Sequence, residues 1–238
     1  MIKFNISNLD WREYNIVDST INTAQSIISN EEVSKGLVII ANSQDSGRGS
    51  GSNKWQSPEG NLYTTTILNN NYLNYYCIKY EQLYLISILS TANIVLDYCN
   101  DDIQRLIKWP NDIYVNNQKA SGLLLHKEDS YTLLSIGLNI NNAPAGFYQL
   151  NNTNKVLSVK DIMKKILYYM SFYAQKTLKE LMVIYTKKML NYNTFITVKN
   201  KLHSYSGIIK GINSKMELLV ESETGVYTVN NKLFITNC

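Results

Sequence analysis

One segment limits the fold of this chain more than any other: the uninterrupted apolar run Leu37-Val38-Ile39-Ile40. A strand with one face in water alternates apolar and polar side chains, whereas a strand covered on both faces has no need to alternate. The run therefore predicts a buried strand over residues 36–41, in a sheet with a layer on each side. The composition allows such a core, because 45% of the residues are hydrophobic and 18% are charged.

The flanking sequence predicts a mixed α+β domain around this strand. A short strand over 12–17 ends at Asp18-Ser19-Thr20, where either hydroxyl can cap a helix over 21–28. Apolar spacing and capping residues predict two further helical regions, 80–98 and 158–190. Additional strands are predicted at 62–68, 103–109, 112–115, 119–126 and 131–140.

The chain changes character after Asn193. The remainder consists of short, closely spaced β-prone segments, which predict a small C-terminal β-barrel packed on the first domain. We therefore expect a catalytic domain over 1–193 and a barrel domain over 194–238. The predicted strands of the barrel are 195–198, 206–211, 217–220, 226–229 and 233–236.

Charge and cysteine usage exclude several protein classes. A net charge of +4 is too small for a dedicated nucleic-acid binder, so we expect no DNA binding. No window approaches the twenty apolar residues of a membrane span, and the N-terminus is too short and polar for a signal peptide. Three cysteines without metal-ligand spacing suggest reduced thiols in the cytoplasm.

A long loop over 42–60 contains Gly47-Arg48-Gly49. Glycines let backbone N–H groups turn towards an anion, and Arg48 between them can clamp a phosphate or a carboxylate. Lys54 adds charge and Trp55 offers a stacking face. A flexible surface linker explains this segment alone equally well. The segment is neither a P-loop nor a Rossmann turn.

A second segment is Lys108-Trp109-Pro110-Asn111-Asp112, with Lys119 on the next predicted strand. A site that brings a carboxylate against a triphosphate needs fixed positive charge and usually a metal. Lys119 would supply the charge and Asp112 would hold Mg²⁺. The structural alternative is a strand end and a hairpin with solvated lysines.

In a third segment, Gly137 permits close approach of another group, and Asn139 offers a donor and an acceptor to an adenine edge. An ordinary core strand explains this segment as well.

Together these segments resemble the biotin–protein ligase family in order and spacing. The lysine-tryptophan-proline-asparagine-aspartate block, with a lysine seven residues beyond its aspartate, is the most specific part. The resemblance covers nearly the whole chain. The segments that carry it are Asp18-Ser19-Thr20, Gln44, Gly47-Arg48-Gly49, Trp55, the block 108–112, 119–122 and Gly137-Leu138-Asn139.

The resemblance implies a fold and a reaction. The fold is a mixed sheet flanked by helices, like that of class II aminoacyl-tRNA synthetases and of biotin and lipoate ligases. The reaction makes biotinyl-5'-AMP from biotin, ATP and Mg²⁺, and then transfers biotin to one lysine of a biotin carboxyl carrier domain in a biotin-dependent carboxylase. The resemblance is compatible with a homodimer.

The same resemblance assigns site residues by position. Catalysis would fall to Lys119, Arg48 and Asp112, with Asp112 as the metal ligand. The residues that would bind biotin are Ser19, Thr20, Gln44, Arg48, Gly49, Ser50, Lys119 and Gly122. The residues that would bind ATP are Arg48, Lys54, Trp55, Asn111, Lys119 and Asn139.

The chain also departs from the family pattern. Ser50 and Asn53 stand where the family loop commonly carries arginines, and Ile21 stands where an asparagine often follows the serine-threonine pair. The catalytic pattern begins by residue 12, so we expect the short form without an N-terminal DNA-binding domain. Two other functions stay open: a lipoate-type ligase, and a binding module that retains biotin without ligating it.

Overall fold

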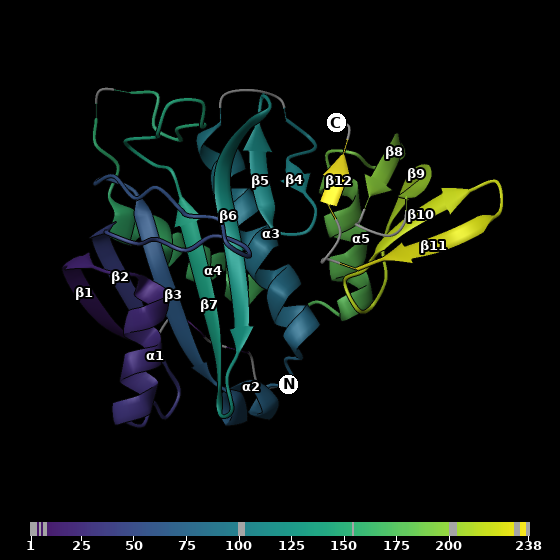
Figure 1. The fold of residues 1–238 in the computed structure, drawn as a ribbon. Helices are drawn as coiled ribbons and strands as arrows, with labels where there is room; N and C mark the ends of the chain where they lie inside the picture. Colours follow the sequence, from purple (N-terminus) through teal and green to yellow (C-terminus); the bar gives the residue numbers. More distant parts are fainter. Residues whose placement is uncertain are drawn as a thin grey trace.

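A seven-stranded mixed sheet forms the centre of the molecule (Figure 1). The computed structural model describes residues 4, 6, 9–99, 103–153, 155–199, 204–230 and 234–236. The strand order is β1-β2-β3-β7-β6-β5-β4, with β1 and β2 parallel and the other pairs antiparallel. The strands are β1 (Asp10–Val17), β2 (Gly36–Gln44), β3 (Leu62–Asn69), β4 (Ile107–Lys108), β5 (Asp112–Val115), β6 (Gln118–Lys127) and β7 (Tyr131–Leu138).

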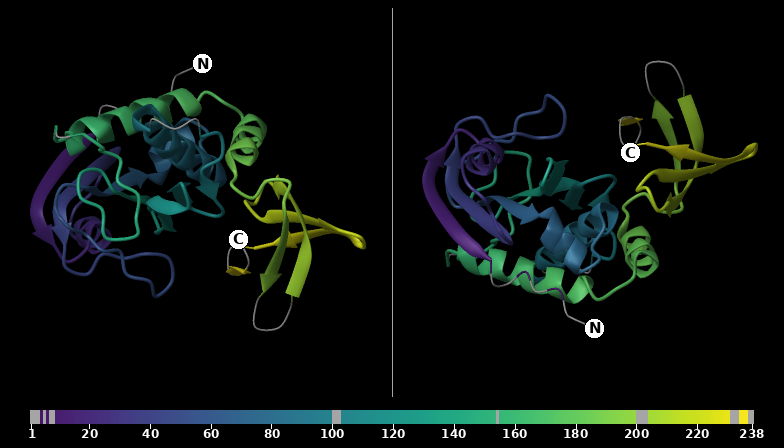
Figure 2. Two further views of the ribbon diagram at one scale, coloured as in Figure 1. Left: turned by 90° about the horizontal axis from the view of Figure 1, so that it is seen from above. Right: turned by 90° about the horizontal axis from the view of Figure 1, so that it is seen from below.

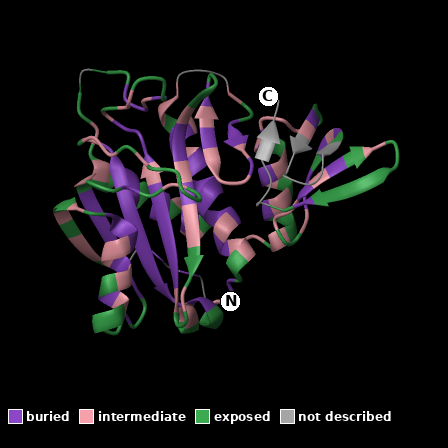
Figure 3. Ribbon diagram, viewed as in Figure 1, coloured by how far each residue is buried: buried purple, intermediate pink, exposed green. Residues whose placement is uncertain are grey.

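The sheet is covered on both faces, as the apolar run predicts (Figures 2 and 3). Leu37 and Ile39 of β2 pack with Ala24 and Ile27 of helix α1 (Thr20–Asn30). The alternate residues of β2 join the larger core on the other face, where helices α3 (Tyr80–Tyr98) and α4 (Val159–Tyr173) pack. All eight residues of β3 are buried, because β3 lies between β2 and β7 under both layers.

Local signals placed most helix starts correctly. The Ser19 side chain accepts a hydrogen bond from Ile21 N, and Ser158 accepts one from Asp161 N. The single helical region predicted over 158–190 is wrong, since it divides into α4 and α5 (Leu178–Lys188). Thr177 and Glu180 form a capping box that begins α5. A short helix, α2 (Asn70–Tyr75), was not predicted.

The strand predicted over 103–109 is also wrong in extent, because only Ile107 and Lys108 form β4. Leu106 N donates instead to Lys188 O at the end of α5, at 2.9 Å. The backbone before β4 therefore pairs with the end of a helix that lies far away in sequence. The predicted hairpin after it is confirmed, and Asn116 and Asn117 turn between β5 and β6 with φ of 49° and 62°.

A second, antiparallel sheet follows α5, in the order β11-β10-β9-β8-β12. The small C-terminal β unit is therefore confirmed as an antiparallel sheet with β11 and β12 at its edges, while its closure into the predicted β-barrel remains a prediction. Ile209 and Ile212 join the same apolar cluster as Tyr185 of α5, so the core continues from one sheet to the other. The domain boundary at 193/194 remains a prediction. The strands are β8 (Phe195–Lys199), β9 (Ser204–Ile212), β10 (Leu218–Ser222), β11 (Gly225–Val229) and β12 (Phe234–Thr236).

Two further sequence predictions concern membranes and thiols. Within the described part of the chain, no helix combines the length and the apolar character needed to cross a bilayer. Cys77 and Cys99 are free thiols, while Cys238 lies outside the described residues.

Asn61 joins the end of the glycine-rich loop to the segment after β7. Only 1% of its surface is exposed. Its Oδ1 accepts hydrogen bonds from the backbone N–H groups of Ile140 at 2.7 Å, Asn141 at 3.1 Å and Asn142 at 3.2 Å. Its Nδ2 donates to Asn142 O at 2.6 Å. One side chain thus accepts from three consecutive backbone N–H groups beside Asn139, and the contact to Ile140 N is buried.

We predict that Asn61→Ala lowers the free energy of unfolding by about 3 kcal/mol, because it leaves the buried N–H of Ile140 and the partly buried N–H of Asn142 without their acceptor. Urea denaturation followed by circular dichroism measures the change. Asn30→Ala is the control, because Asn30 is an exposed residue at the end of α1 and its loss costs at most about 0.5 kcal/mol. Equal midpoints for the two variants would contradict this role.

Candidate active site

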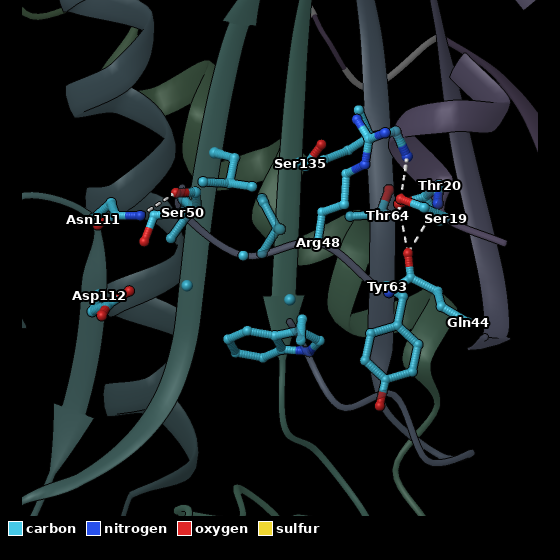
Figure 4. A pocket seen from close by; sticks show the side chains of 18 of the residues that line it. Ser19, Thr20, Gln44, Arg48, Ser50, Tyr63, Thr64, Asn111, Asp112 and Ser135 are labelled. Atoms are coloured by element: carbon cyan, nitrogen blue, oxygen red, sulfur yellow. Dashed lines mark hydrogen bonds between the residues drawn. The ribbon is translucent and has the colours of Figure 1, made fainter. Parts of the chain in front are cut away.

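A cavity lies where the loop 45–61 crosses the sheet, and it brings together the predicted biotin-binding residues (Figure 4). In Figure 4 the Arg48 side chain points towards the end of the cavity where Thr20 and Ser135 lie, and Asn111 and Asp112 lie at the opposite end. The lining residues are Ser19, Thr20, Ile21, Gln44, Arg48, Gly49, Ser50, Trp55, Tyr63, Thr64, Asn111, Asp112, Lys119, Gly122, Leu123, Leu124, Ser135, Ile136 and Gly137.

The glycine-rich loop is a small hairpin rather than an irregular linker. Arg48 and Lys54 pair as an antiparallel bridge, and Trp55 N donates to Gly47 O at 2.8 Å. A Cβ at Gly47 would lie 2.5 Å from Trp55 O, so the hairpin requires glycine there. Ser50 and Asn53, which replace family arginines, form the turn, with Asn53 N donating to Ser50 O at 3.2 Å.

The Trp55 indole lies against two glycines of the sheet. A Cβ added to Gly137 would be 2.6 Å from Trp55 Cε2, and one added to Gly122 would be 3.1 Å from Cζ3. Lys119 Nζ lies 5.2 Å from the indole centroid, which is within the range of a cation–π contact. Trp55 Nε1 is buried without a hydrogen-bond partner among the described residues. The two glycines thus provide the space that the ring occupies.

A second cavity shares the walls formed by Trp55 and Lys119. Its volume is about 470 Å³, and Lys54 and Asn139 also line it. Asn139 Nδ2 makes a long contact of 3.4 Å to Lys119 O, and its Oδ1 has no partner in the described structure. Four of the predicted ATP residues therefore line the second cavity, while Arg48 and Asn111 line the first.

Asp112 and Lys119 form an ion pair between the facing strands β5 and β6. Lys119 Nζ lies 2.7 Å from Asp112 Oδ1, and about a quarter of each side chain is exposed, at 24% and 23%. Burial raises the pKa of Asp112, and the nearby positive charges of Lys119 and Lys108 only partly oppose that effect. The pair leaves a lysine ammonium fixed at the junction of the two cavities.

Asn111, next to Asp112 in the chain, makes hydrogen bonds to the backbone of β6. Its Nδ2 donates to Leu123 O at 2.7 Å, and Leu123 N donates back to Asn111 O at 3.0 Å. Both hydrogen bonds hold the turn after Pro110 against β6. The side chain lines the cavity, but its amide hydrogen bond is directed to the sheet.

Gln44 connects the start of α1 to the loop. Its Oε1 accepts from Thr20 N at 2.9 Å and from Thr20 Oγ1 at 3.2 Å. Its Nε2 donates to Ser57 Oγ at 2.9 Å, and Ser57 Oγ donates to Trp55 O at 3.2 Å. One amide therefore orients both the helix end and the loop segment that carries Trp55.

Several lining residues belong to no sequence motif. These are Tyr63 and Thr64 on β3 and Ser135 on β7. Ser57, which also belongs to no motif, does not line the cavity but accepts a hydrogen bond from Gln44 Nε2. The three threonines within the otherwise apolar strand β3 could have indicated a polar cavity. Strand periodicity, however, does not identify which face of the sheet lines a cavity. The described residues contain no cluster of three histidine, cysteine or acidic side chains that could hold a metal ion.

The model of the Biotin/lipoate A/B protein ligase family matches residues 14–141. The chain belongs to this family. Its relatives include the bifunctional ligase/repressor BirA of Bacillus subtilis (strain 168), 31% identical over 140 residues that cover 56% of this chain and 41% of that protein. The biotin–protein ligase of Homo sapiens is 30% identical over 116 residues, which cover 45% of this chain and 16% of that protein. The chain thus spans less than half the length of the curated relatives it matches.

Solved structures extend the family likeness to the whole fold. A biotin protein ligase from Aquifex aeolicus in complex with biotin and ATP has a TM-score of 0.79 at 24% identity. The alignment covers 96% of this chain and 99% of that chain. The second sheet is therefore part of the shared architecture.

We predict that Gly137→Ala displaces the Trp55 indole, because the added methyl group would overlap the ring. The tryptophan emission of the variant should shift towards that of exposed indole, and the shift should vanish in a Trp55→Phe background. Gly122→Ala is the matched control, since its Cβ would lie 3.1 Å from the ring and requires a smaller movement. An unchanged spectrum for Gly137→Ala would contradict the contact.

We predict that Asp112 makes stability fall as the pH rises. The folded state keeps the proton on Asp112 at a pH where the unfolded chain, with a pKa of about 4, has released it. This group's contribution to the free energy of unfolding therefore decreases from about pH 4 upwards through the raised pKa. Urea denaturation of the wild type and of Asp112→Asn between about pH 4 and 7 isolates this contribution as the difference between the two curves. A difference that stays constant with pH would show that the pKa is not raised.

Proposed function

We propose that this chain is a biotin–protein ligase, which forms biotinyl-5'-AMP from biotin and ATP and then transfers biotin to a lysine of a carrier domain. The meeting of two cavities at Lys119 and Trp55 carries this proposal. Two substrates that react end to end need adjoining sites, and two anions need a fixed cation between them. The names of the relatives and the biotin and ATP in the Aquifex aeolicus complex support the same reaction.

The first cavity suits biotin. Hydroxyl and amide groups of Ser19, Thr20 and Gln44 lie at one end, where a ureido ring needs donors and acceptors. Trp55 and Ile136 supply apolar walls for the rest of the bicycle. The cavity has a volume of only about 40 Å³, against about 300–1,000 Å³ for typical small-molecule sites. Binding therefore requires the loop side chains Arg48 and Trp55 to move.

Adenylation would take place beside Lys119. A carboxylate oxygen of biotin attacks the α-phosphorus of ATP, the bond to the bridging oxygen breaks, and pyrophosphate leaves. The ammonium of Lys119 offsets the charge that builds on the α-phosphoryl oxygens, and Arg48 approaches the same anions from the loop. The ion pair with Asp112 positions the ammonium before the substrates arrive.

Transfer would follow without a covalent enzyme intermediate. The amine of the acceptor lysine attacks the carbonyl carbon of biotinyl-5'-AMP, an amide bond forms, and AMP leaves while the amine loses a proton. The partner in this proposal is a biotin carboxyl carrier domain of a biotin-dependent carboxylase. We place the reaction in the cytoplasm and include a homodimer as the assembly to be measured in solution.

We place Mg²⁺ at Asp112, where substrate phosphates would supply further ligands. Mg²⁺ commonly binds one or two carboxylates together with substrate phosphates, and Asp112 is the carboxylate among the described residues that line the cavity. The ion would neutralise phosphate charge when bound. Asp112 would then divide its negative charge between the ion and Lys119.

Labelling of a recombinant carrier domain tests the proposal. The purified chain, biotin and MgATP should attach biotin to one lysine, which mass spectrometry detects, and omission of ATP should abolish the product. Attachment of lipoate in preference to biotin would establish the lipoate-type ligase instead. Biotin binding without any labelling would establish the non-catalytic module.

We predict that Lys119→Ala lowers the rate of biotinyl-5'-AMP formation by about 100-fold or more, because it removes the fixed cation at the reacting centre. The thermal unfolding midpoint should change little, since the lysine is partly exposed. Release of pyrophosphate measures the rate. Lys127→Ala is the matched control, a lysine on the same strand outside the cavity. A near-normal rate for Lys119→Ala would remove the role given to this residue.

A further inference from the structure

Ser135 belongs to none of the sequence motifs, yet its side chain lines the first cavity at the end where Thr20 lies (Figure 4). It is on β7, directly opposite Thr65 of β3, and 8% of its surface is exposed. The two hydroxyl oxygens are 2.8 Å apart. This distance shows a hydrogen bond but leaves open which of the two oxygens donates.

The rest of the network decides the direction of that bond. Gln44 Oε1 faces the N–H of Thr20 and can only accept, so the single proton of Thr20 Oγ1 is directed to Gln44 Oε1. Thr20 Oγ1 must then accept from Thr65 Oγ1, at 2.9 Å. The proton of Thr65 is used in that bond. Ser135 is therefore the donor to Thr65, and the chain of hydrogen bonds has one direction.

This direction determines what Ser135 offers to the cavity. Its proton is directed to Thr65, so only its lone pairs remain for a ligand. In the described part of the chain, no second hydrogen bond to the Ser135 hydroxyl is found. A ligand atom that meets Ser135 must therefore be a hydrogen-bond donor.

We propose that Ser135 is a specificity-determining residue, which accepts a hydrogen bond from a ring N–H of the substrate. This inference rests on the proposed function. The ureido ring of biotin carries N–H groups, whereas the dithiolane ring of lipoate has none. A ring without a donor leaves the lone pairs of the Ser135 hydroxyl without a hydrogen bond, which disfavours such a ligand. Thr65, which is fully buried, is the positioning residue that holds the proton of Ser135 away from the cavity.

Steady-state kinetics and biotin binding by the full chain test this inference. Ser135→Ala should raise the KM and the Kd for biotin roughly two- to tenfold, the range expected for one neutral hydrogen bond. The KM for ATP and kcat should change less than about twofold, because the lost contact is made equally in the ground state and the transition state. The preference for biotin over lipoate in competition should fall by the same factor as biotin affinity.

Ser121→Ala is the matched control. Ser121 is a buried serine on the neighbouring strand β6, and it donates to Gly137 O at 2.7 Å without lining the cavity. Its loss should affect stability but not the KM for biotin. If circular dichroism shows that Ser135→Ala does not fold, Ser135→Cys keeps the side-chain volume with a weak acceptor and should give the same loss.

The outcomes separate this inference from the proposed function. Unchanged or tighter biotin binding by the Ser135 variants, beside an active wild type, would overturn the role of Ser135 and leave the ligase proposal standing. A wild type that neither binds biotin nor labels a carrier domain would overturn both.

Discussion

The close contact between the Trp55 indole and the sheet is the constraint on which the arrangement of the site depends. A strand surface normally carries a Cβ at every position, which keeps a neighbouring ring at a distance. At Gly122 and Gly137 this distance disappears, and the indole lies directly on β6 and β7. The ring thereby divides the space over the sheet into two cavities. A larger residue at Gly137 would move the ring and merge or close these spaces.

The position of the Lys119 ammonium, where the two cavities meet, also depends on the Trp55 indole. Lys119 lies beside the indole and pairs with Asp112, so its ammonium has two neighbours that hold it in position. Partial burial makes the field of this ammonium stronger than it would be in water. The raised pKa of Asp112 shows that burial is already unfavourable for its carboxylate. Phosphate groups or a cation at the junction would therefore change the balance of the pair.

Polar contacts of Gln44 and Ser57 hold the loop 45–61 in this position. Gln44 joins Thr20 to Ser57, and Ser57 contacts the carbonyl of Trp55. The same amide fixes the direction of the hydroxyl chain that ends at Ser135. A ligand that moves Gln44 would thus shift both the loop and the end of the first cavity where Thr20 and Ser135 lie.

The sequence by itself determined the buried strand β2, the capped helix α1, the β5–β6 hairpin and the family motifs, because each depends on residues that are neighbours in the chain. It did not determine that β4 would shorten, since Leu106 pairs with Lys188 through the tertiary structure. It also did not show that the predicted site residues divide between two cavities that share Trp55 and Lys119. Ser135, Thr65 and Thr20 lie on different elements, and their hydrogen bonds acquire a direction only when Gln44 supplies an acceptor from a fourth. Local propensities act over a few residues, whereas the side chains that face a cavity are decided by which strands become neighbours.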